Sequence, residues 1–349
     1  MLTLAVALSA AWSVPSVLPR VPVAAARGFG VQMADTDFDL IIVGCGVGGH
    51  GAALHAVSKG LKVAVCAGED VGGTCVNRGC VPSKALLAAS GRVREMGDAD
   101  HLAALGITSG GVSYDREKVA AHAQNLANRV KGNLEGSLTA LGVTVFPNKG
   151  KLASPKSVEL VNGGKTISAD NVLLATGSAP FVPPGIEVDG KTVFTSDEAL
   201  KLEWVPDWIA IIGSGYIGLE FSDVYTALGS EVTFIEAMPK MMPGFDRQIA
   251  GLADRLLIRP RNIDSYTNVF ASKVTPGIPG EKPATVEMID ATTKEHTATI
   301  EVDAVMVCTG RVPYSEGLGL QEQGVQMNRG FVAVDEKMRT LDEVPPPAP

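Results

Sequence analysis

Two cysteines separated by four residues carry the clearest chemical signal in this sequence. Cys75 and Cys80 lie in the segment Gly72-Gly-Thr-Cys-Val-Asn-Arg-Gly-Cys-Val-Pro-Ser-Lys84. Two neighbouring thiols can form a disulfide that exchanges with a thiol substrate, which is redox chemistry. In a regular helix these residues would lie roughly 8 Å apart, whereas a disulfide needs Cα atoms within about 7 Å. Gly79 and Pro82 let the backbone depart from a regular helix, so a redox pair is possible here.

Three other interpretations of the pair stay open from these residues alone. The pair could be a structural disulfide, half of a zinc site, or two unrelated buried thiols. A zinc ion usually takes four nitrogen or sulfur ligands, and the other cysteines, Cys45, Cys66 and Cys308, lie in apolar strand or turn segments. We therefore expect no metal site, and the motifs that flank the pair favour the redox interpretation.

The pair follows a segment with the pattern of a dinucleotide-binding turn. A strand over residues 39–43, apolar after Asp39, runs into Gly44, Gly46 and Gly49 and then into a helix. In such a turn the first glycine permits a tight bend and the second lets the backbone approach a pyrophosphate. The third lets the helix pack on the strand. This motif alone is weak evidence, but the strand 62–66 follows at a suitable distance and completes a βαβ unit.

The same pattern recurs later in the chain. Gly213, Gly215 and Gly218 follow another apolar strand, and the next strand, residues 231–236, ends in Glu236. A second repeat supports the first, since the apolar strands that end in Thr176-Gly177 and Thr309-Gly310 are each followed shortly by proline. We therefore expect an α/β fold with two Rossmann-like dinucleotide-binding domains.

An overlay of the two copies exposes one difference. Glu236 stands where an acid usually binds a ribose hydroxyl, and its counterpart in the first copy is Ala67. Either Glu69 takes over from a shifted backbone, or the adenosine ribose has no charged partner. A charged hydrogen bond contributes roughly 1.5 to 3 kcal/mol, so its loss would weaken dinucleotide binding without abolishing it.

The remaining segments supply the elements around these motifs. Residues 115–141 predict a long amphipathic helix, and residues 143–174 predict a small antiparallel meander. Proline and glycine punctuate residues 181–190, the expected crossing between the domains. A further β-rich stretch covers residues 263–307.

The composition is that of a two-domain globular protein. The 349 residues are 46% hydrophobic and 19% charged, with a formal net charge of −8. Because no Lys/Arg cluster offsets this acidic balance, we expect neither nucleic acid nor an anionic membrane as a partner. No apolar run reaches the length of a membrane span.

Residues 1–36 predict a targeting presequence. Residues 1–34 contain no acid, open with an apolar run and continue with scattered arginines and serines. The apolar opening is typical of a secretory signal and the later part of a transit peptide, a combination that plastids surrounded by extra membranes require. We therefore expect a plastid location, the chloroplast stroma, with the mitochondrial matrix as the alternative.

Together these motifs resemble the pyridine nucleotide-disulfide oxidoreductase family of flavoprotein reductases. The resemblance rests on the two glycine fingerprints, the segment from Cys75 to Cys80, and the two Thr-Gly strand ends. Within the family, residues 213–221 and 242–246 make the chain most similar to the plastid-type dihydrolipoyl dehydrogenases. The resemblance covers residues 37 to about 342.

This resemblance implies a role for each motif. The first fingerprint would bind FAD and the second NAD, while Cys75 would exchange with the dithiol substrate and Cys80 would face the flavin. Lys84 and Glu220 resemble the family's ion pair beside the flavin, although an ordinary salt bridge between domains is the alternative. The expected cofactor contacts are Gly44, Gly46, Gly49, Glu69, Gly73, Thr74, Lys84, Thr176, Gly177, Gly213, Gly215, Gly218, Glu236, Gly310 and Arg311.

The implied activity is oxidation of protein-bound dihydrolipoamide by NAD⁺ through FAD and the Cys75/Cys80 disulfide. The implied setting is a 2-oxoacid (pyruvate) dehydrogenase complex, with a lipoyl domain as partner and a homodimer in the full-length family. Other disulfide reductases, such as glutathione or mercuric reductase, are alternatives. A non-catalytic nucleotide-binding fragment is a further alternative of a different class.

The sequence departs from the family's pattern after Arg311. Members of the family then return to the FAD domain, present a Gly-Asp pair to the flavin, and add an interface domain whose His and Glu serve the partner's disulfide. This sequence contains neither feature, and its last histidine is His296. We therefore expect a C-terminally truncated chain that lacks the dimerisation domain and the family's general base, and that is incomplete for activity. The expected divisions are a presequence at 1–36, an FAD-binding domain at 37–180, an inserted NAD-binding domain at 181–311 and a truncated return segment at 312–349.

Overall fold

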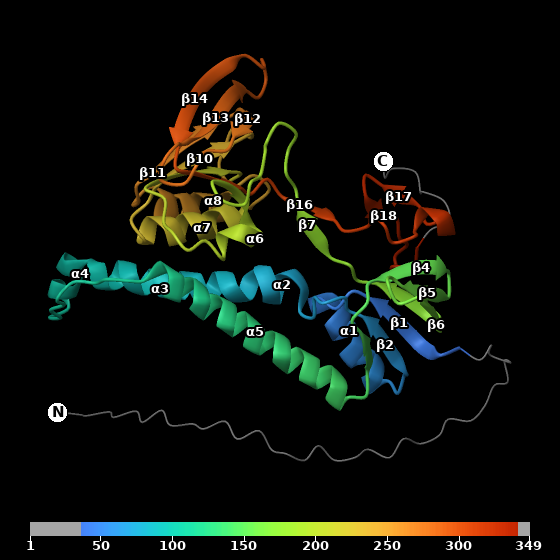
Figure 1. The fold of residues 1–349 in the computed structure, drawn as a ribbon. Helices are drawn as coiled ribbons and strands as arrows, with labels where there is room; N and C mark the ends of the chain where they lie inside the picture. Colours follow the sequence, from blue (N-terminus) through green and yellow to red (C-terminus); the bar gives the residue numbers. More distant parts are fainter. Residues whose placement is uncertain (1–35, 341–349) are drawn as a thin grey trace, which may run out of the picture. The chain divides into compact units, whose positions relative to one another are not determined.

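The computed structural model describes residues 36–340 (Figure 1). The predicted presequence, residues 1–36, lies almost wholly outside the described residues, as does the end of the return segment 312–349. Within the described part of the chain, no helix is long and apolar enough to cross a membrane.

The first sheet has six strands in the order β3-β2-β1-β6-β5-β4. Its parallel part is built from β1 (Phe38–Val43), β2 (Val63–Cys66), β3 (Thr144–Phe146) and the end of β6 (Lys165–Leu174). Every residue of β2 is buried, which is typical of a parallel strand covered on both faces.

The meander predicted for residues 143–174 is only partly correct. β4 (Gly150–Ser154) and β5 (Ser157–Leu160) do pair antiparallel, and β5 pairs antiparallel with the start of β6. However, β3 joins β2 as a parallel edge strand, and the end of β6 pairs parallel with β1. Since β6 has 10 residues, its two ends serve different partners. Side-chain alternation reports the face that a residue occupies, not the strand that it pairs with.

Five helices accompany this sheet in the described chain. They are α1 (Val47–Ser58), α2 (Gly73–Arg78), α3 (Cys80–Gly97), α4 (Ala99–Ala104) and α5 (Arg116–Ala140). The prediction of a long helix over residues 115–141 is confirmed, because Asp115 caps the start of α5 and Leu141 its end. Figure 1 shows α3 and α5 as the two long helices, and small alanines on the buried face of α5 let α3 pack against it.

The second sheet has five parallel strands in the order β11-β10-β9-β15-β8. They are β8 (Val193–Thr195), β9 (Trp208–Ile212), β10 (Glu231–Glu236), β11 (Ile263–Thr267) and β15 (Ala304–Val307). Helix α7 (Tyr216–Ala227) connects β9 to β10 as α1 connects β1 to β2. The short helices α6 (Ser196–Ala199) and α8 (Arg247–Ala253) also belong here, and α8 continues as a π-helical turn, Asp254–Ile258.

An antiparallel sheet of three strands completes this second half. β12 (Val269–Thr275), β13 (Ala284–Asp290) and β14 (His296–Val302) pair in chain order. Their apolar side chains share a core with one face of the second parallel sheet, including Ala210 and Ile235. The β-rich stretch predicted for residues 263–307 is therefore present, divided between two sheets.

The chain crosses between the two halves twice. β7 (Ser178–Pro180) and β16 (Arg311–Pro313) form an antiparallel pair at this crossing. After β16 the chain returns to the first sheet, where Leu318 and Leu320 are buried in the core under β4–β6. A 3-10 helix (Gln321–Gln323) and the hairpin of β17 (Met327–Asn328) and β18 (Phe331–Val332) follow.

Gly49 and Gly51 on α1 provide a matched test of the contact between this helix and β1. A Cβ at Gly49 would lie 2.0 Å from the carbonyl oxygen of Gly44, whereas nothing lies within 4 Å of one at Gly51. We expect Gly49→Ala to lower the free energy of unfolding by about 1–3 kcal/mol through overpacking. Gly51→Ala should be neutral or stabilise by up to about 1 kcal/mol. Chemical denaturation measures both, and equal effects would contradict the close contact.

Candidate active site

The two glycine-rich segments of the first half touch through their backbones. Gly46 forms an isolated bridge with Gly72, and Gly72 N donates to Cys45 O at 2.8 Å. A Cβ at Gly73 would lie 2.6 Å from Gly46 Cα, and Gly73 has a φ of 58°. Both the close approach and the left-handed backbone favour glycine here. The contact places the start of α2, and with it Cys75, beside the dinucleotide-binding turn.

Cys75 and Cys80 are brought together across the break between α2 and α3. Cys75 is half-buried on α2, Cys80 is the exposed first residue of α3, and both are free thiols in this structure. Gly79 separates the helices, and a Cβ there would lie 2.8 Å from Thr74 O. Burial raises the pKa of the Cys75 thiol to about 11, a hydrogen bond with Cys80 adds to the rise, and the positive charge of Lys84 opposes it.

Both thiols line a cavity of about 860 Å³, the main cavity. Most of the predicted contacts of the first fingerprint share this lining: Gly44, Gly46, Glu69, Gly73, Thr74, Thr176 and Gly177. Gly49 lies behind it, buried where α1 packs on β1. Among the residues that the structure describes, no histidine lines the main cavity.

Some lining residues were not singled out from the sequence. They are Asp70, Arg78, Lys149, Ser178, Tyr314 and Leu318. Asp70 precedes the segment Gly72–Lys84 and Arg78 lies within it, between the two cysteines, so their opposite charges were a local signal. Tyr314 and Leu318 come from the return segment, and no local pattern indicates that they reach this cavity.

Ion pairs hold the thiol segment in place. Arg78 donates to both carboxylate oxygens of Asp70 at 2.7 Å and lies 3.4 Å from Asp197. Although burial opposes ionisation of Asp70, hydrogen bonds from Arg78 and Asn77 lower its pKa. Burial raises the pKa of Asp197, and the positive charges of Arg311 and Arg78 offset part of this rise. The end of α2 is therefore anchored both to the loop after β2 and to α6.

Lys84 and Glu220 meet between α3 and α7. Lys84 Nζ lies 2.6 Å from Glu220 Oε1, and Ser83 Oγ donates to Glu220 Oε2 at 3.3 Å. The Lys84 side chain is 58% exposed, so the pair contributes little stability by itself. Arg311 lies in the crossing between the two halves, where it donates to Thr74 Oγ1 at 3.3 Å and to Ser178 O at 2.7 Å.

The second fingerprint repeats the geometry of the first. Ile212 pairs with Ile235 as Val43 pairs with Cys66. Gly213 and Gly44 both have a left-handed φ, 98° and 101°. Gly213 N donates to Ile235 O and Gly44 N donates to Cys66 O, each at 2.9 Å. Gly215 and Gly218 stand in this turn as Gly46 and Gly49 stand in the first. The overlay of the two copies is therefore correct in the structure.

Glu236 at the end of β10 is buried and already hydrogen-bonded. It accepts from Ser214 N at 3.0 Å, from Ser214 Oγ at 2.6 Å and from Met238 N at 2.9 Å. Ser214 Oγ in turn accepts from Met242 N at 2.8 Å. A carboxylate can accept about four hydrogen bonds, so about one remains for a ligand hydroxyl. The sequence did not single out Ser214, because only the fold brings it to Glu236.

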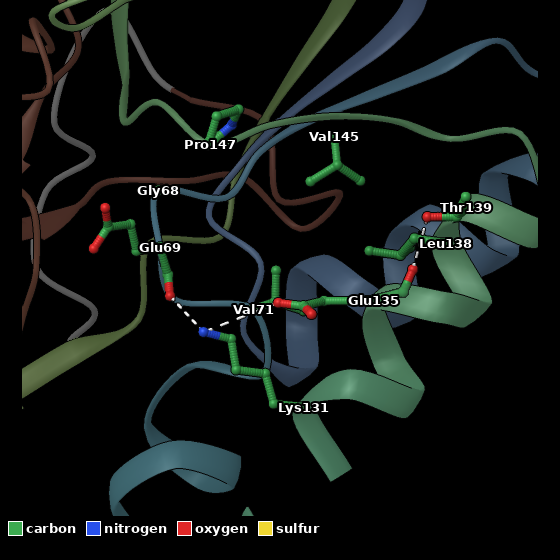
Figure 2. A pocket seen from close by; sticks show the side chains of 9 residues that line it. All are labelled: Gly68, Glu69, Val71, Lys131, Glu135, Leu138, Thr139, Val145 and Pro147. Carbon is green, nitrogen blue, oxygen red and sulfur yellow. Dashed lines mark hydrogen bonds and ion pairs between the residues drawn. The ribbon is translucent and has the colours of Figure 1, made fainter. Parts of the chain in front are cut away.

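Ala67 occupies the position of Glu236 in the first copy and is buried. Glu69, the predicted substitute, is exposed and lines the main cavity. Its carbonyl oxygen accepts from Lys131 Nζ at 2.9 Å, while its carboxylate points away from Lys131 (Figure 2). The two Thr-Gly strand ends meet the crossing, since Thr176 Oγ1 donates to Tyr314 O and Thr309 Oγ1 donates to Phe181 O. Gly310 follows Thr309 directly.

Comparison with known proteins places this geometry in context. The family model "Pyridine nucleotide-disulphide oxidoreductase" matches residues 38–344. Dihydrolipoyl dehydrogenase 2, chloroplastic, of Arabidopsis thaliana is 58% identical over 327 residues, covering 93% of this chain and 57% of that protein. A dihydrolipoyl dehydrogenase of Synechocystis is 56% identical over 315 residues, covering 89% and 66%. The chain thus spans less than two thirds of the length of these relatives.

Solved structures agree in fold. LpdA from Mycobacterium tuberculosis matches with a TM-score of 0.75 at 30% identity, covering 86% of this chain and 65% of that one. The flavoprotein disulfide reductase RclA from Escherichia coli matches with a TM-score of 0.71 at 24% identity, covering 86% and 63%. At that identity, the second likeness concerns the fold alone.

The raised pKa of Cys75 predicts slow alkylation at neutral pH. Only the thiolate reacts, so in the reduced chain the rate with iodoacetamide at Cys75 should climb with pH towards a midpoint of about 11. Lys84→Gln removes a positive charge that favours the thiolate and should move the midpoint upward. Peptide mass spectrometry across pH measures both rates. A midpoint near the ordinary thiol value would contradict the burial of Cys75.

The Ser214 network predicts a large loss of stability on removal of one hydroxyl. Ser214→Ala takes a charge-assisted donor from Glu236 and leaves Met242 N without its acceptor. We expect the free energy of unfolding to fall by about 1.5 to 3 kcal/mol. Ser222→Ala is the matched control, since this buried hydroxyl donates only to Leu219 O at 2.8 Å and should cost about 0.5–1.5 kcal/mol. Chemical denaturation compares them, and a smaller loss at Ser214 would contradict its bridging role.

Proposed function

The chain belongs to the pyridine nucleotide-disulphide oxidoreductase family, and we propose that it provides the FAD-binding and NAD-binding parts of a dihydrolipoyl dehydrogenase. The reaction is oxidation of protein-bound dihydrolipoamide by NAD⁺. The observation that carries this proposal is the placement of Cys75 and Cys80 together on the wall of a cavity that also exposes the first glycine turn. The two dihydrolipoyl dehydrogenases at 56% and 58% identity support the choice of reaction within the family.

The main cavity suits FAD, the cofactor that this family uses with NAD(H). Its volume of about 860 Å³ lies within the usual range for cofactor sites. The first turn of α1 carries no acid, and Gly46 caps it without a side chain, so its backbone N–H groups remain available to a diphosphate. Gly44, Gly46, Gly73, Thr74, Thr176 and Gly177 would hold FAD. Bound FAD supplies a two-electron carrier between the dithiol and NAD⁺.

The thiol chemistry is assigned to Cys75 and Cys80 themselves. A substrate thiolate attacks Sγ of Cys75 in the disulfide state, the S–S bond breaks, and Cys80 leaves as a thiolate. The second substrate thiolate then attacks the mixed disulfide, which releases lipoyl disulfide and the Cys75 thiolate. The pair has gained two electrons, and return to the disulfide passes them on. Lys84, which is paired with Glu220, favours the Cys75 thiolate through its positive charge.

The second fingerprint is proposed to bind NAD. Gly213, Gly215 and Gly218 form the turn, and Glu236 would accept from a ribose hydroxyl with its remaining lone pair. A carboxylate at this position repels the 2′-phosphate of NADP, so NAD(H) is the preferred form. By this assignment FAD-binding residues span 37–180, NAD-binding residues span 181–311, and residues 312–349 return to the FAD domain. Gly310 and Arg311 lie where the two meet.

The partner and the compartment follow from the reaction and from one relative. A lipoyl domain of a 2-oxoacid dehydrogenase complex, such as the pyruvate complex, would deliver the dithiol, and a homodimer is the expected assembly. The relative from Arabidopsis thaliana is named as chloroplastic. That name and the acid-free residues 1–34 support a plastid location.

A trapping experiment on the oxidised chain tests the exchange without turnover. Dihydrolipoamide should open the Cys75–Cys80 disulfide, so that thiol counting finds two additional thiols. In Cys80→Ser, oxidised lipoamide should form a mixed disulfide with Cys75 that mass spectrometry detects. Cys308→Ala is the control, because Cys308 does not line the main cavity, and this variant should behave as the parent chain.

The outcomes separate the proposed reaction from its alternatives. NAD⁺ reduction by dihydrolipoamide in the FAD-loaded chain should require both Cys75 and Cys80, and NADP⁺ should be the poorer acceptor. Faster opening of the disulfide by glutathione than by dihydrolipoamide would instead favour another disulfide reductase. Two free thiols at these positions in the folded, air-oxidised chain would defeat the redox assignment.

A further inference from the structure

A second cavity adjoins the main one where the first copy lacks its acid. This side cavity has a volume of about 510 Å³ and lies between the loop after β2, the end of β3 and helix α5 (Figure 2). Gly68 and Glu69 line both cavities. Since Ala67 directly precedes them, the side cavity lies next to the position of the missing acid.

Two charged side chains of α5 reach into the side cavity. Lys131 Nζ donates to Glu69 O at 2.9 Å and lies 3.9 Å from Glu135 Oε1, four residues further along the helix. Figure 2 shows both side chains directed at the loop after β2, with the Glu135 carboxylate beside Val71. Their side chains are 32% and 49% exposed, so the carboxylate of Glu135 is held near the loop yet stays open to a ligand.

The negative charge of Glu135 also acts on Cys45 in the dinucleotide-binding turn. Burial raises the pKa of Cys45 to about 11, and the negative charges of Glu135 and Asp70 add to the rise. Cys45 lies between Gly44 and Gly46, and all three line the main cavity. Glu135 therefore lies within electrostatic range of the dinucleotide-binding turn.

We propose that Glu135 is the acid that accepts from the adenosine ribose of FAD, in place of the residue missing at Ala67. Lys131 is its positioning residue, because it ties the helix to the loop through Glu69 O. This inference rests on the proposed binding of FAD by the first fingerprint. Glu69 is the alternative candidate, since it lines both cavities; its exposed side chain has no charged partner in the side cavity, because its carboxylate points away from Lys131 (Figure 2).

The geometry agrees with what a ribose contact needs. The diphosphate site at the start of α1 and the strand end at Ala67 fix the direction in which the adenosine extends. The adenosine must pass the loop that begins at Gly68, and this loop forms one wall of the side cavity. An acid on α5 can meet it there from the opposite wall, without a side chain at position 67.

The test is binding of ADP, 2′-deoxy-ADP and FMN to the full chain without FAD, measured by calorimetry. ADP carries the adenosine and diphosphate, 2′-deoxy-ADP lacks one ribose hydroxyl, and FMN lacks the adenosine altogether. Glu135→Gln should weaken ADP binding about tenfold, the order of effect for one charged hydrogen bond. It should leave FMN binding unchanged. Glu117→Gln, an exposed acid on the same helix outside both cavities, should change neither.

Two further binding measurements test whether Glu135 contacts the ribose. If Glu135 accepts from the ribose 2′-hydroxyl, the losses of affinity caused by Glu135→Gln and by removal of that hydroxyl should not add. The variant should then bind ADP and 2′-deoxy-ADP almost equally. Ala67→Glu restores the acid at the strand end and should recover ADP affinity in the Glu135→Gln background. Circular dichroism melting checks that each variant is folded.

Each contrary outcome has a distinct meaning. Unchanged ADP affinity in Glu135→Gln would overturn the inference, and a tenfold loss in Glu69→Gln instead would assign the role to Glu69. Equal weakening of ADP and FMN would show that Glu135 acts only through the fold. If the parent chain binds neither ADP, FMN nor FAD, the proposed function itself fails rather than this inference.

Discussion

The close backbone contact between the turn at Gly46 and the turn at Gly72–Gly73 is the constraint on which the site depends. Without side chains on either segment, the start of α2 can lie against the dinucleotide-binding turn. Helix α2, which carries Cys75, therefore lines the same cavity as the backbone amides of the turn that would hold a diphosphate. Backbone geometry therefore places the two thiols in the same cavity as the turn that would hold the cofactor, and the ion pairs of Arg78 fix the far end of α2.

Two copies of one βαβ unit serve different purposes in this chain. Their strand registers and glycine turns coincide, but the acid at the end of the second strand survives only in the second copy. Glu236 is buried at a cost that three hydrogen bonds offset, and Ser214 carries that network onward to Met242. Ala67 needs no such network. The first copy is thus simpler at this strand end, and in the proposed role of Glu135 recognition of the ribose comes from outside the βαβ unit.

The two halves are joined mainly by α3 and α7. Apolar side chains of both helices share one core, and at its rim Asp223 binds Arg94 and Arg261, the latter at 2.6 Å. These groups are only partly exposed, with Arg261 at 15%, so their attraction is less screened than that of a surface pair. Lys84 and Glu220 lie on the same pair of helices. The interface therefore also holds the lysine whose positive charge favours the thiolate of Cys75.

Local sequence patterns determined the two glycine turns, the thiol pair and the helix from Arg116 to Ala140, because each depends on residues close together in the chain. The family resemblance supplied the pairing of Lys84 with Glu220. Only the tertiary structure decided that the two ends of β6 pair with different strands and that Ser214 bridges Glu236 and Met242. It also decided that Lys131 and Glu135 line a cavity with the loop that follows Ala67. Those contacts join residues far apart in sequence, and neither periodicity nor local spacing encodes which distant segments pack together.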